Sequence, residues 1–429
     1  MTGRSKKLAI HGGQKTVTLD PGDIFKWPIV TEEDEAAVLD VIRRGVMSQF
    51  DITQGFEKEF AEWIGTKHAL CFGNGTMALL GAMFGCGLGA GDEIIGPSLT
   101  YWATMLPALN LRAVPVLAEV DPDTLCIDPT DIEHRITERT KAVIITHHFG
   151  HPCDMDRIMP IVEKHGLKLI EDVSHAQGGL YKGKKLGTFG EVGAMSLMAG
   201  KSFPIGEGGI FVTNDRLVWE RAVAFGHYGR TMREGIITDP ELARFRGMPL
   251  GGVKFRLNQT ASAMGRVQLK YYDERCVEIR RAMSLFWDCL EGCPGLQAHR
   301  VDEKTDSNMG GLYAAMGLLK PEEIGGVTNV KFAEAVRAEG AECTPSCGNT
   351  SPIHLHPILR EADVHNEGKP TAIAHSERTD CTKPGDLPVT EAVMSRVISV
   401  PRFKRFNKEY VEQQAAAFRK VAENYRELL

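Results

Sequence analysis

Two short apolar runs, each followed by a reactive side chain, constrain the fold of this chain most strongly. Residues 167–170 (Leu-Lys-Leu-Ile) predict a buried strand, and Asp172 follows directly after it. Residues 193–198 form the second run, and Lys201 lies three residues beyond its end. Ligands of open α/β sheets bind beyond the carboxyl ends of the strands. We therefore expect Asp172 and Lys201 to lie in a functional site.

A carboxylate and a lysine at two strand ends suit the cofactor pyridoxal phosphate. This cofactor needs a lysine amine for a Schiff base and an acid that keeps its pyridine nitrogen protonated, so that the ring accepts electrons. The alternative is a surface lysine and a helix-capping aspartate. Asp172 and Lys201 alone do not decide between these interpretations.

A glycine turn upstream predicts a phosphate site. Residues 73–76 are Gly-Asn-Gly-Thr, and an apolar helical pattern begins at Met77. The start of a helix presents free N–H groups and a positive dipole end, which bind anions. Gly75 and Thr76 are thus candidates for binding the cofactor phosphate. The alternative is an ordinary helix cap at Asn74 or Thr76.

The order of the apolar patterns predicts an α/β fold. Runs at 114–117 and 142–146 indicate further strands, with helical patterns between and after them. Residues 31–45 predict the first helix, because Thr31 and Asp34 form an approximate capping box. Strands that alternate with helices indicate a mostly parallel sheet. Two further stretches, 231–250 and 343–387, show little periodicity and are predicted to be loops. Residues 408–429, at the end of the chain, predict an amphipathic helix.

Composition limits the classes of partner. Of 429 residues, 43% are hydrophobic, which excludes a disordered chain. The 50 basic and 56 acidic residues are interspersed and give a net charge of −6, which argues against nucleic-acid binding. The most apolar stretch, 69–90, is broken by polar residues and glycines, so we expect no membrane span. The basic start, Met1–Lys7, is not followed by a long apolar region, so we expect no signal peptide.

Cysteines and histidines do not predict a metal site. The ten cysteines are scattered, and the pairs Cys289/Cys293 and Cys343/Cys347 do not have zinc-knuckle spacing. A cluster of His147, His148, His151 and Cys153 is interpreted as a neutral wall of the site. We therefore expect free thiols, no bound metal and a cytoplasmic location.

Taken together, the motifs resemble the DegT/StrS family of sugar aminotransferases, which have the aspartate-aminotransferase fold (fold type I). They occur in the family's order between about residues 8 and 270. They are Asn74-Gly75-Thr76, Gly89-x-Gly91-Asp92-Glu93, Pro97-Ser98-x-Thr100-Tyr101, Glu171-Asp172-x-x-His175-Ala176-x-Gly178, Ser196-x-x-x-x-Lys201 and Gly206-Glu207-Gly208-Gly209.

The resemblance implies a domain organisation. It implies an N-terminal segment at 1–29 and a large cofactor-binding domain at 30–275, with a mainly parallel seven-stranded sheet. A smaller α+β C-terminal domain is implied at 276–429.

The resemblance also implies roles for individual residues. Lys201 would hold pyridoxal 5'-phosphate as an internal aldimine and move protons, and Asp172 would stabilise the pyridinium. An aromatic ring over the pyridine corresponds to Tyr101, or to Trp102 if the register shifts by one. The other implied contacts are Gly75, Thr76 and Ser196 at the phosphate, His175 close to the cofactor, and Lys254 at the phosphate of a partner subunit. The alternative for His175 is a hydrogen-bonded core histidine, and the alternative for Lys254 is a solvated lysine. The implied role of Lys254 in turn implies a homodimer with a shared active site.

The implied activity is amino transfer from glutamate or glutamine to a nucleotide-linked keto-sugar or a keto-cyclitol. The opening Leu8–Gly13 resembles the cyclitol-using branch. One alternative is a pyridoxal-type sugar dehydratase, although related dehydratases generally lack the lysine found at Lys201. Another is a catalytically silent sensor or binding protein. A nicotinamide dehydrogenase is disfavoured, because no G-x-G-x-x-G follows the first strand.

Overall fold

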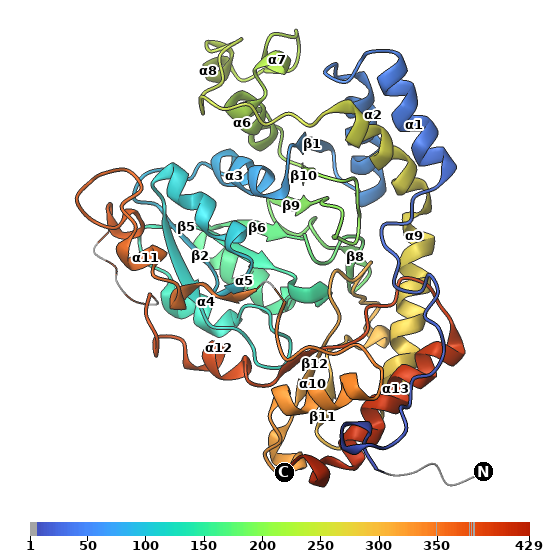
Figure 1. Ribbon diagram of the computed structural model, residues 1–429. Coiled ribbons are helices and arrows are strands. Elements are labelled where there is room, and N and C mark those ends of the chain that lie inside the picture. The colour runs from blue at the N-terminus through green and yellow to red at the C-terminus, as the bar shows by residue number, and fades with distance from the viewer. Residues whose placement is uncertain (1–6, 349, 377, 379, 381) are drawn as a thin grey trace.

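A mainly parallel sheet forms the centre of the computed structural model, which describes residues 7–348, 350–376, 378, 380 and 382–429 (Figure 1). Within these residues the sheet has seven strands in the order β1-β10-β9-β6-β5-β2-β4. β10 runs antiparallel to both of its neighbours, and the other pairs are parallel. The predicted fold class is therefore confirmed. The strands are β1 (His68–Phe72), β2 (Glu93–Pro97), β4 (Val114–Ala118), β5 (Thr140–Thr146), β6 (Lys168–Asp172), β9 (Val192–Ser196) and β10 (Gly209–Thr213).

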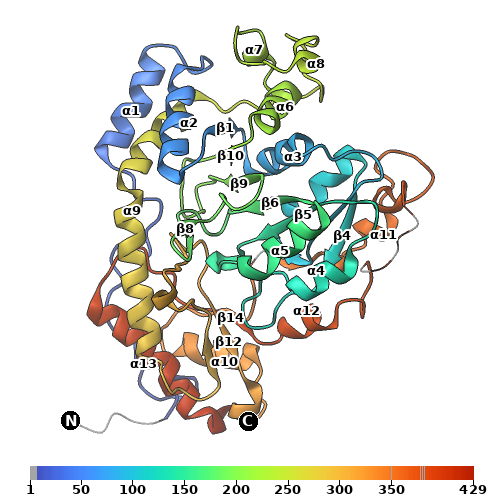
Figure 2. The same ribbon diagram turned by 180° about the vertical axis from the view of Figure 1, so that it is seen from behind.

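Helices cover both faces of this sheet (Figures 1 and 2). Apolar side chains of α3 and α6 pack against one face, and those of α4 and α5 pack against the other. Beside them, α2 and α9 cover β1, β9 and β10. The helices of this part are α1 (Glu32–Arg43), α2 (Asp51–Ile64), α3 (Gly75–Gly85), α4 (Pro129–Arg135), α5 (Met155–His165), α6 (Arg216–Gly226), α7 (Tyr228–Thr231), α8 (Pro240–Ala243) and α9 (Gln259–Asp288).

Local sequence signals set several helix starts as predicted. Thr31 and Asp34 form the capping box of α1. The Asn74 side chain accepts a hydrogen bond from the Met77 N–H and begins α3. The predicted strands at 114–117 and 142–146 correspond to β4 and β5.

The register of the sheet brings the chemically important strand ends together. Thr146 of β5 lies beside Asp172 of β6. Phe72, which ends β1, pairs with Gly209, and Gly209 pairs with Ser196. The start of α3, just after β1, is thus brought next to the end of β9.

The C-terminal part forms a second layer around a small antiparallel sheet. β11 (Leu296–Ala298), β12 (Met316–Leu319) and β14 (Val397–Ser399) pack with α10 (Asn329–Ala338), α13 (Lys408–Glu423) and the end of α9. The N-terminal segment joins the same core through Leu8, Val17 and Ile24. Helix α9 continues through residue 275, so the division into 1–29, 30–275 and 276–429 stays a proposal.

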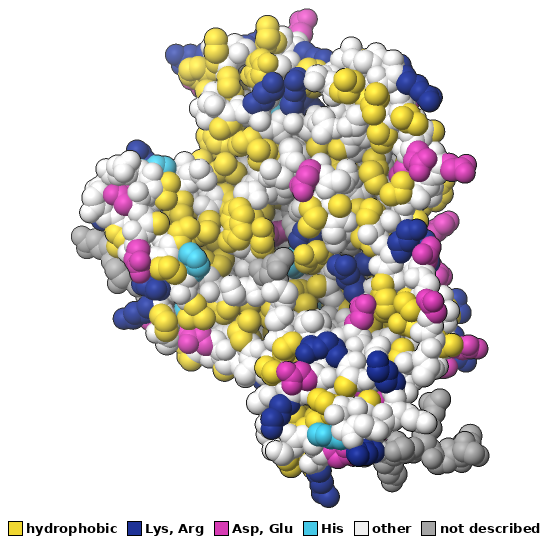
Figure 3. Space-filling view, viewed as in Figure 1, with side chains coloured by type: hydrophobic (Ala, Val, Ile, Leu, Met, Phe, Trp, Pro, Cys, Tyr) yellow, Lys and Arg dark blue, Asp and Glu magenta, His cyan; other side chains and the backbone are white. Residues whose placement is uncertain are grey.

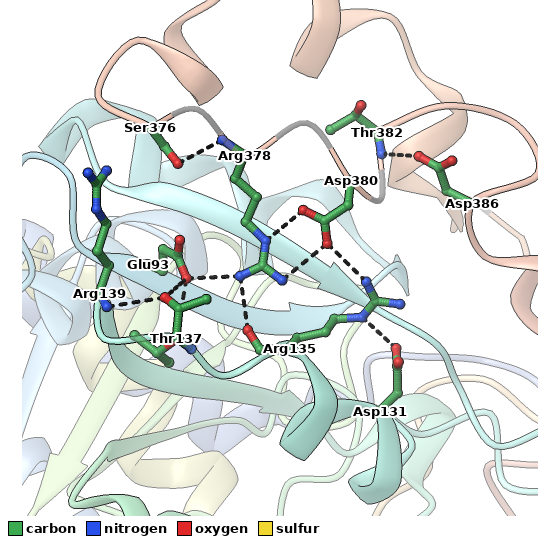
Figure 4. A network of polar contacts seen from close by, with 11 residues as sticks. Glu93, Asp131, Arg135, Thr137, Arg139, Ser376, Arg378, Asp380, Thr382 and Asp386 are labelled. Atoms are coloured by element: carbon green, nitrogen blue, oxygen red, sulfur yellow. Dashed lines mark hydrogen bonds and ion pairs between the residues drawn. The ribbon is translucent and has the colours of Figure 1, made fainter.

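The chain after α10 then returns to the large sheet. β13 (Ser351–Pro352) pairs with β3 (Leu99–Thr100), and α11 (Ile358–Glu361) and α12 (Pro388–Val393) follow. Figure 4 shows how this segment is fixed: Arg378 Nη1 donates to Glu93 Oε2 at 2.9 Å, and its Nε donates to Asp380 Oδ1 at 2.7 Å. The loop predicted at 343–387 therefore contains short elements and is anchored on the sheet. A further hairpin pairs β7 (Leu180–Tyr181) with β8 (Lys184–Lys185).

No helix in the described part of the chain is both long and apolar enough to span a membrane.

Candidate active site

A cavity of about 390 Å³ lies at the carboxyl ends of the parallel strands. It brings together most of the residues singled out from the sequence. These are Gly75, Thr76, Tyr101, Asp172, His175, Ser196 and Lys201. Lys254 does not line the cavity: its side chain is exposed, and its Nζ lies 5.9 Å from the ring centroid of Tyr228.

The Asp172 carboxylate is held from two sides. Its Oδ2 accepts a hydrogen bond from the Thr104 hydroxyl at 2.8 Å, and its Oδ1 accepts one from the Ser174 N–H at 3.0 Å. The Thr104 hydroxyl is in turn 2.9 Å from the hydroxyl of Thr100, which lies 3.0 Å from that of Thr146. Asp172 is buried, so these bonds fix the orientation of a carboxylate that has little access to water.

Lys201 lies in the turn that follows β9. Its backbone is fixed by a hydrogen bond from its own N–H to Met198 O at 2.8 Å and by one from Trp27 Nε1 to Lys201 O, also at 2.8 Å. Its Nζ lies 3.8 Å from the ring centroid of Tyr313. Burial lowers the pKa of Lys201 to about 8, against the opposing effect of the Asp172 charge. About a tenth of the amine is therefore neutral and nucleophilic at pH 7, far more than for an exposed lysine.

His175 is a neutral ring in the wall of the cavity. Its Nδ1 accepts a hydrogen bond from the Phe149 N–H at 3.3 Å, which leaves the ring proton on Nε2. The ring stacks on Tyr313 with centroids 4.5 Å apart. Burial, followed by the charges of Lys201 and His148, moves the pKa of His175 well below its usual value. His175 is thus both a hydrogen-bonded core residue and a lining residue.

The start of α3 meets the end of β9 very closely. A Cβ added to Gly75 would lie 2.6 Å from Ser196 Cβ, so only glycine fits at this position. In the described part of the chain the Gly75 and Thr76 N–H groups donate to no protein acceptor. Free N–H groups at a helix start, beside the Ser196 hydroxyl, suit a phosphate group.

These features together fit pyridoxal phosphate. The cavity offers the Lys201 amine, the Asp172 carboxylate and the α3 N-terminus, which match the aldehyde, the pyridine nitrogen and the phosphate of that cofactor.

The two adjacent aromatic residues differ in position. Tyr101 lines the cavity, whereas Trp102 lines an adjoining apolar cavity of about 540 Å³. Their ring centroids are 5.1 Å apart. Because Tyr101 lines the active-site cavity, we favour it over Trp102 as the ring that covers the cofactor. This role stays a prediction.

Most of the histidine cluster after β5 is hydrogen-bonded within the protein, but neither ring nitrogen of the buried His148 has a hydrogen-bond partner among the described residues. His147 Nε2 lies 3.1 Å from Glu171 Oε2, and His147 Nδ1 accepts from the Cys153 N–H at 3.1 Å. Among the residues that the structure describes, no group of three or more His, Cys, Asp or Glu side chains is arranged to bind a metal ion.

Several residues of the site were not identified from the sequence. Thr104 contacts Asp172 from 68 positions away, and Tyr313 and Arg402 reach the cavity from the C-terminal part. Trp27 bonds to the Lys201 carbonyl from the N-terminal segment. No local pattern in the sequence marks them.

Known proteins resemble this chain along nearly its full length. Residues 28–419 match the DegT/DnrJ/EryC1/StrS aminotransferase family. The L-glutamine:scyllo-inosose aminotransferase of Streptomyces griseus is 31% identical over 431 residues, covering 98% of this chain and 99% of that protein. The L-glutamine:2-deoxy-scyllo-inosose aminotransferase of Streptomyces lividus is 32% identical over 427 residues, with coverage of 97% and 98%. Among solved structures, the aminotransferase from Psychrobacter cryohalolentis superposes with a TM-score of 0.80 at 26% identity, over 94% of this chain and 100% of that one.

Proposed function

The chain belongs to the DegT/DnrJ/EryC1/StrS aminotransferase family, and from this premise we propose that it transfers the amino group of L-glutamine to a keto-cyclitol. Its cofactor is pyridoxal 5'-phosphate. The observation that carries the proposal is the single cavity that joins the Lys201 amine, the Asp172 carboxylate and the α3 N-terminus. The curated relatives named for inosose substrates, which match almost the whole chain, support the choice of donor and acceptor.

Each of these residues has a defined task in amino transfer. When bound, the cofactor supplies an electron sink for the charge left when the donor loses its α-proton. The Lys201 amine takes that proton at Nζ and later returns a proton, as a general base and acid with a pKa near neutrality. The Asp172 carboxylate, fixed by Thr104 and Ser174, would keep the pyridine nitrogen of the cofactor protonated. The N–H groups of Gly75 and Thr76 bind the phosphate.

The polar lining of the cavity favours an uncharged acceptor with several hydroxyl groups. Lys201 and Arg402 are the only lysine or arginine side chains among the described residues that line it. Arginine and lysine are favoured partners of phosphate groups, so this lining offers few such partners to a diphosphate. Thr76 lines the cavity with its side-chain hydroxyl, whereas the hydroxyls of Thr100, Thr146 and Thr350 are already hydrogen-bonded within the protein.

A nucleotide-linked keto-sugar is the second candidate acceptor. The apolar cavity of about 540 Å³ that contains Trp102 shares Thr76 and Thr100 with the active-site cavity. An aromatic side chain beside an apolar space suits a stacked base.

We also propose that the active enzyme is a homodimer. Figure 3 shows hydrophobic side chains gathered over the upper part of one face, around α6 to α8. The stretch after α7 and α8 carries a group of exposed apolar side chains, because Met232 is 70%, Phe245 47%, Met248 72% and Leu250 39% exposed, and such a patch marks an interaction surface. The exposed Lys254 would then reach the cofactor phosphate of the partner.

The described cysteines are free thiols, in agreement with a reducing, cytoplasmic location.

The proposal is tested by supplying both substrates. The purified protein with added pyridoxal phosphate is incubated with L-glutamine and scyllo-inosose, and the amino-cyclitol is measured by mass spectrometry. Lys201→Ala is the matched control and should give no product. A nucleotide-linked keto-sugar that is aminated faster would favour the second candidate. Deoxygenation without amino transfer would indicate a dehydratase, and binding without either reaction would indicate a sensor.

A further inference from the structure

Lys404 is a buried lysine that the amino-transfer steps described above do not use. It lies in the segment between β14 and α13, and its side chain is only 1% exposed. Its Nζ donates to Leu312 O at 3.1 Å and to Gly311 O at 3.4 Å, and it lies 4.7 Å from the ring centroid of Trp27. The ammonium therefore joins the 311–313 segment to the N-terminal segment.

Both partners of this ammonium lead to Lys201. Trp27 Nε1 donates to Lys201 O at 2.8 Å, so the indole fixes the backbone of the reactive lysine. Tyr313, the residue after Leu312, places its ring centroid 3.8 Å from Lys201 Nζ. Lys404 thus contacts the two groups that hold Lys201, one at its carbonyl and the other at its amine.

Burial of this ammonium carries a free-energy cost. In the part of the chain that the structure describes, no Asp or Glu oxygen lies within 4.0 Å of Lys404 Nζ. Burial, followed by the charge of Arg402, lowers the pKa of Lys404 to about 7, against the opposing effect of Cys276 on α9. A methionine would occupy a similar volume without the cost of desolvating a charge. Packing alone therefore does not explain a lysine at this position.

We propose that Lys404 is a positioning residue for amino transfer, which holds Trp27 and the 311–313 segment so that they fix Lys201. The inference rests on the proposed function, in which Lys201 moves the proton. Lys404 does not line the active-site cavity, so it acts through these neighbours and not on a substrate. A displacement of a reacting group by about 1 Å lowers the rate on the order of 100-fold, so a small shift of Lys201 is sufficient for a measurable effect.

Substitution of Lys404 removes only its side-chain contacts. The Lys404 N–H donates to Ile24 O at 2.8 Å, and any residue other than proline keeps this bond. Lys404→Met removes the donors and the charge but keeps an unbranched side chain. Lys404→Arg keeps a charged donor and should restore part of the loss. Lys331→Met is the matched control, because Lys331 Nζ donates to Leu428 O at 3.0 Å and neither residue lines the cavity.

The first measurement uses the protein without cofactor. Hydrogen exchange of backbone amides is followed by mass spectrometry in peptides that contain Lys201, Trp27 or the 311–313 segment. Lys404→Met should speed exchange in all three, because their shared contact is lost, whereas peptides from β5 should exchange as in the unmodified protein. Unchanged exchange around Lys201 would overturn the inference.

The second measurement uses the protein loaded with pyridoxal phosphate. Decay of its visible absorbance band is recorded against the concentration of L-glutamine, which separates the maximal rate from the half-saturating concentration. Lys404→Met should lower the maximal rate roughly 10- to 100-fold and leave the half-saturating concentration unchanged, because Lys404 positions the base and does not bind the donor. A raised half-saturating concentration with an unchanged maximal rate would overturn the inference.

Trp27→Phe provides a second variant, which keeps the inference testable if Lys404→Met does not fold. It removes the indole N–H that bonds to Lys201 O but keeps a ring beside Lys404. It should lower the same maximal rate, and the double variant should lose less than the product of the two single losses, because both residues act through one set of contacts. An unaltered rate in Trp27→Phe, or losses that multiply, would contradict the inference. If the unmodified protein responds to no α-amino acid, the proposed function has failed, while hydrogen exchange still tests the link between Lys404 and Lys201.

Discussion

Gly75→Ala tests the assignment of the α3 N-terminus as the phosphate site. The added methyl carbon would lie 2.6 Å from Ser196 Cβ and 2.8 Å from Ser196 Cα. Because one of these atoms is backbone, rotation of a side chain cannot relieve the contact, and α3 and β9 must move apart. Overpacking of this kind costs about 1–3 kcal/mol of folding free energy. The N–H groups of Gly75 and Thr76 belong to the first turn of α3 and would move with it.

The expected effect on the cofactor is larger than the effect on folding. A hydrogen bond to a charged group contributes about 1.5–3 kcal/mol, so loss of one such bond weakens binding on the order of 10- to 100-fold. The dissociation constant of pyridoxal phosphate is measured by titration of the apo-protein, and the free energy of unfolding is measured by urea denaturation.

Gly89→Ala is the matched control for that prediction. Nothing lies closer than 3.9 Å to a Cβ at Gly89, and its φ is not positive, so neither the affinity for pyridoxal phosphate nor the free energy of unfolding should fall. If Gly75→Ala binds the cofactor as tightly as the unmodified protein does, the phosphate does not lie at the start of α3.

Three further predictions follow from buried charges. The rate of pyridoxal phosphate uptake by the apo-protein should rise with pH through about 8 rather than near the usual lysine value of about 10.4, because burial favours the neutral amine of Lys201. Asp172→Asn should move the midpoint of that pH dependence to a lower pH, because the Asp172 charge raises the pKa of Lys201. It should also lower turnover roughly 100- to 1,000-fold. An unchanged midpoint would contradict the electrostatic assignment. Arg230→Met should lower the free energy of unfolding, measured in urea, by about 3–5 kcal/mol. The buried Glu57 carboxylate would lose the two hydrogen bonds, at 2.6 and 2.7 Å, that Arg230 donates. Adding Glu57→Gln to this variant should recover part of the loss.

Local patterns were sufficient to predict the framework of the site. The apolar run at 167–170 overlaps β6, which extends to Asp172, the run at 193–198 overlaps β9, and Asn74 caps α3. These features depend on residues that are neighbours in sequence, so periodicity and capping rules apply to them directly.

Contacts between distant segments could not be predicted in this way. Thr104 reaches Asp172 because the chain after β3 folds back over the strand ends. Tyr313 reaches Lys201, and Arg402 bonds to the Tyr313 carbonyl, because the C-terminal sheet packs beside the cavity; neither residue lies in a recognisable motif. The predicted role of Lys254 requires a second subunit, so it stays a prediction.

The absorbance spectrum of the purified protein tests the central claim most directly. The spectrum is recorded with bound pyridoxal phosphate, then after L-glutamine, and then after scyllo-inosose. The account predicts a visible band that decays with the donor and returns with the acceptor, and a Lys201→Ala protein in which neither change occurs. A band that persists in the presence of L-glutamine, or a Lys201→Ala protein that still transfers the amino group, would contradict the assignment of Lys201 as the residue that carries the reaction.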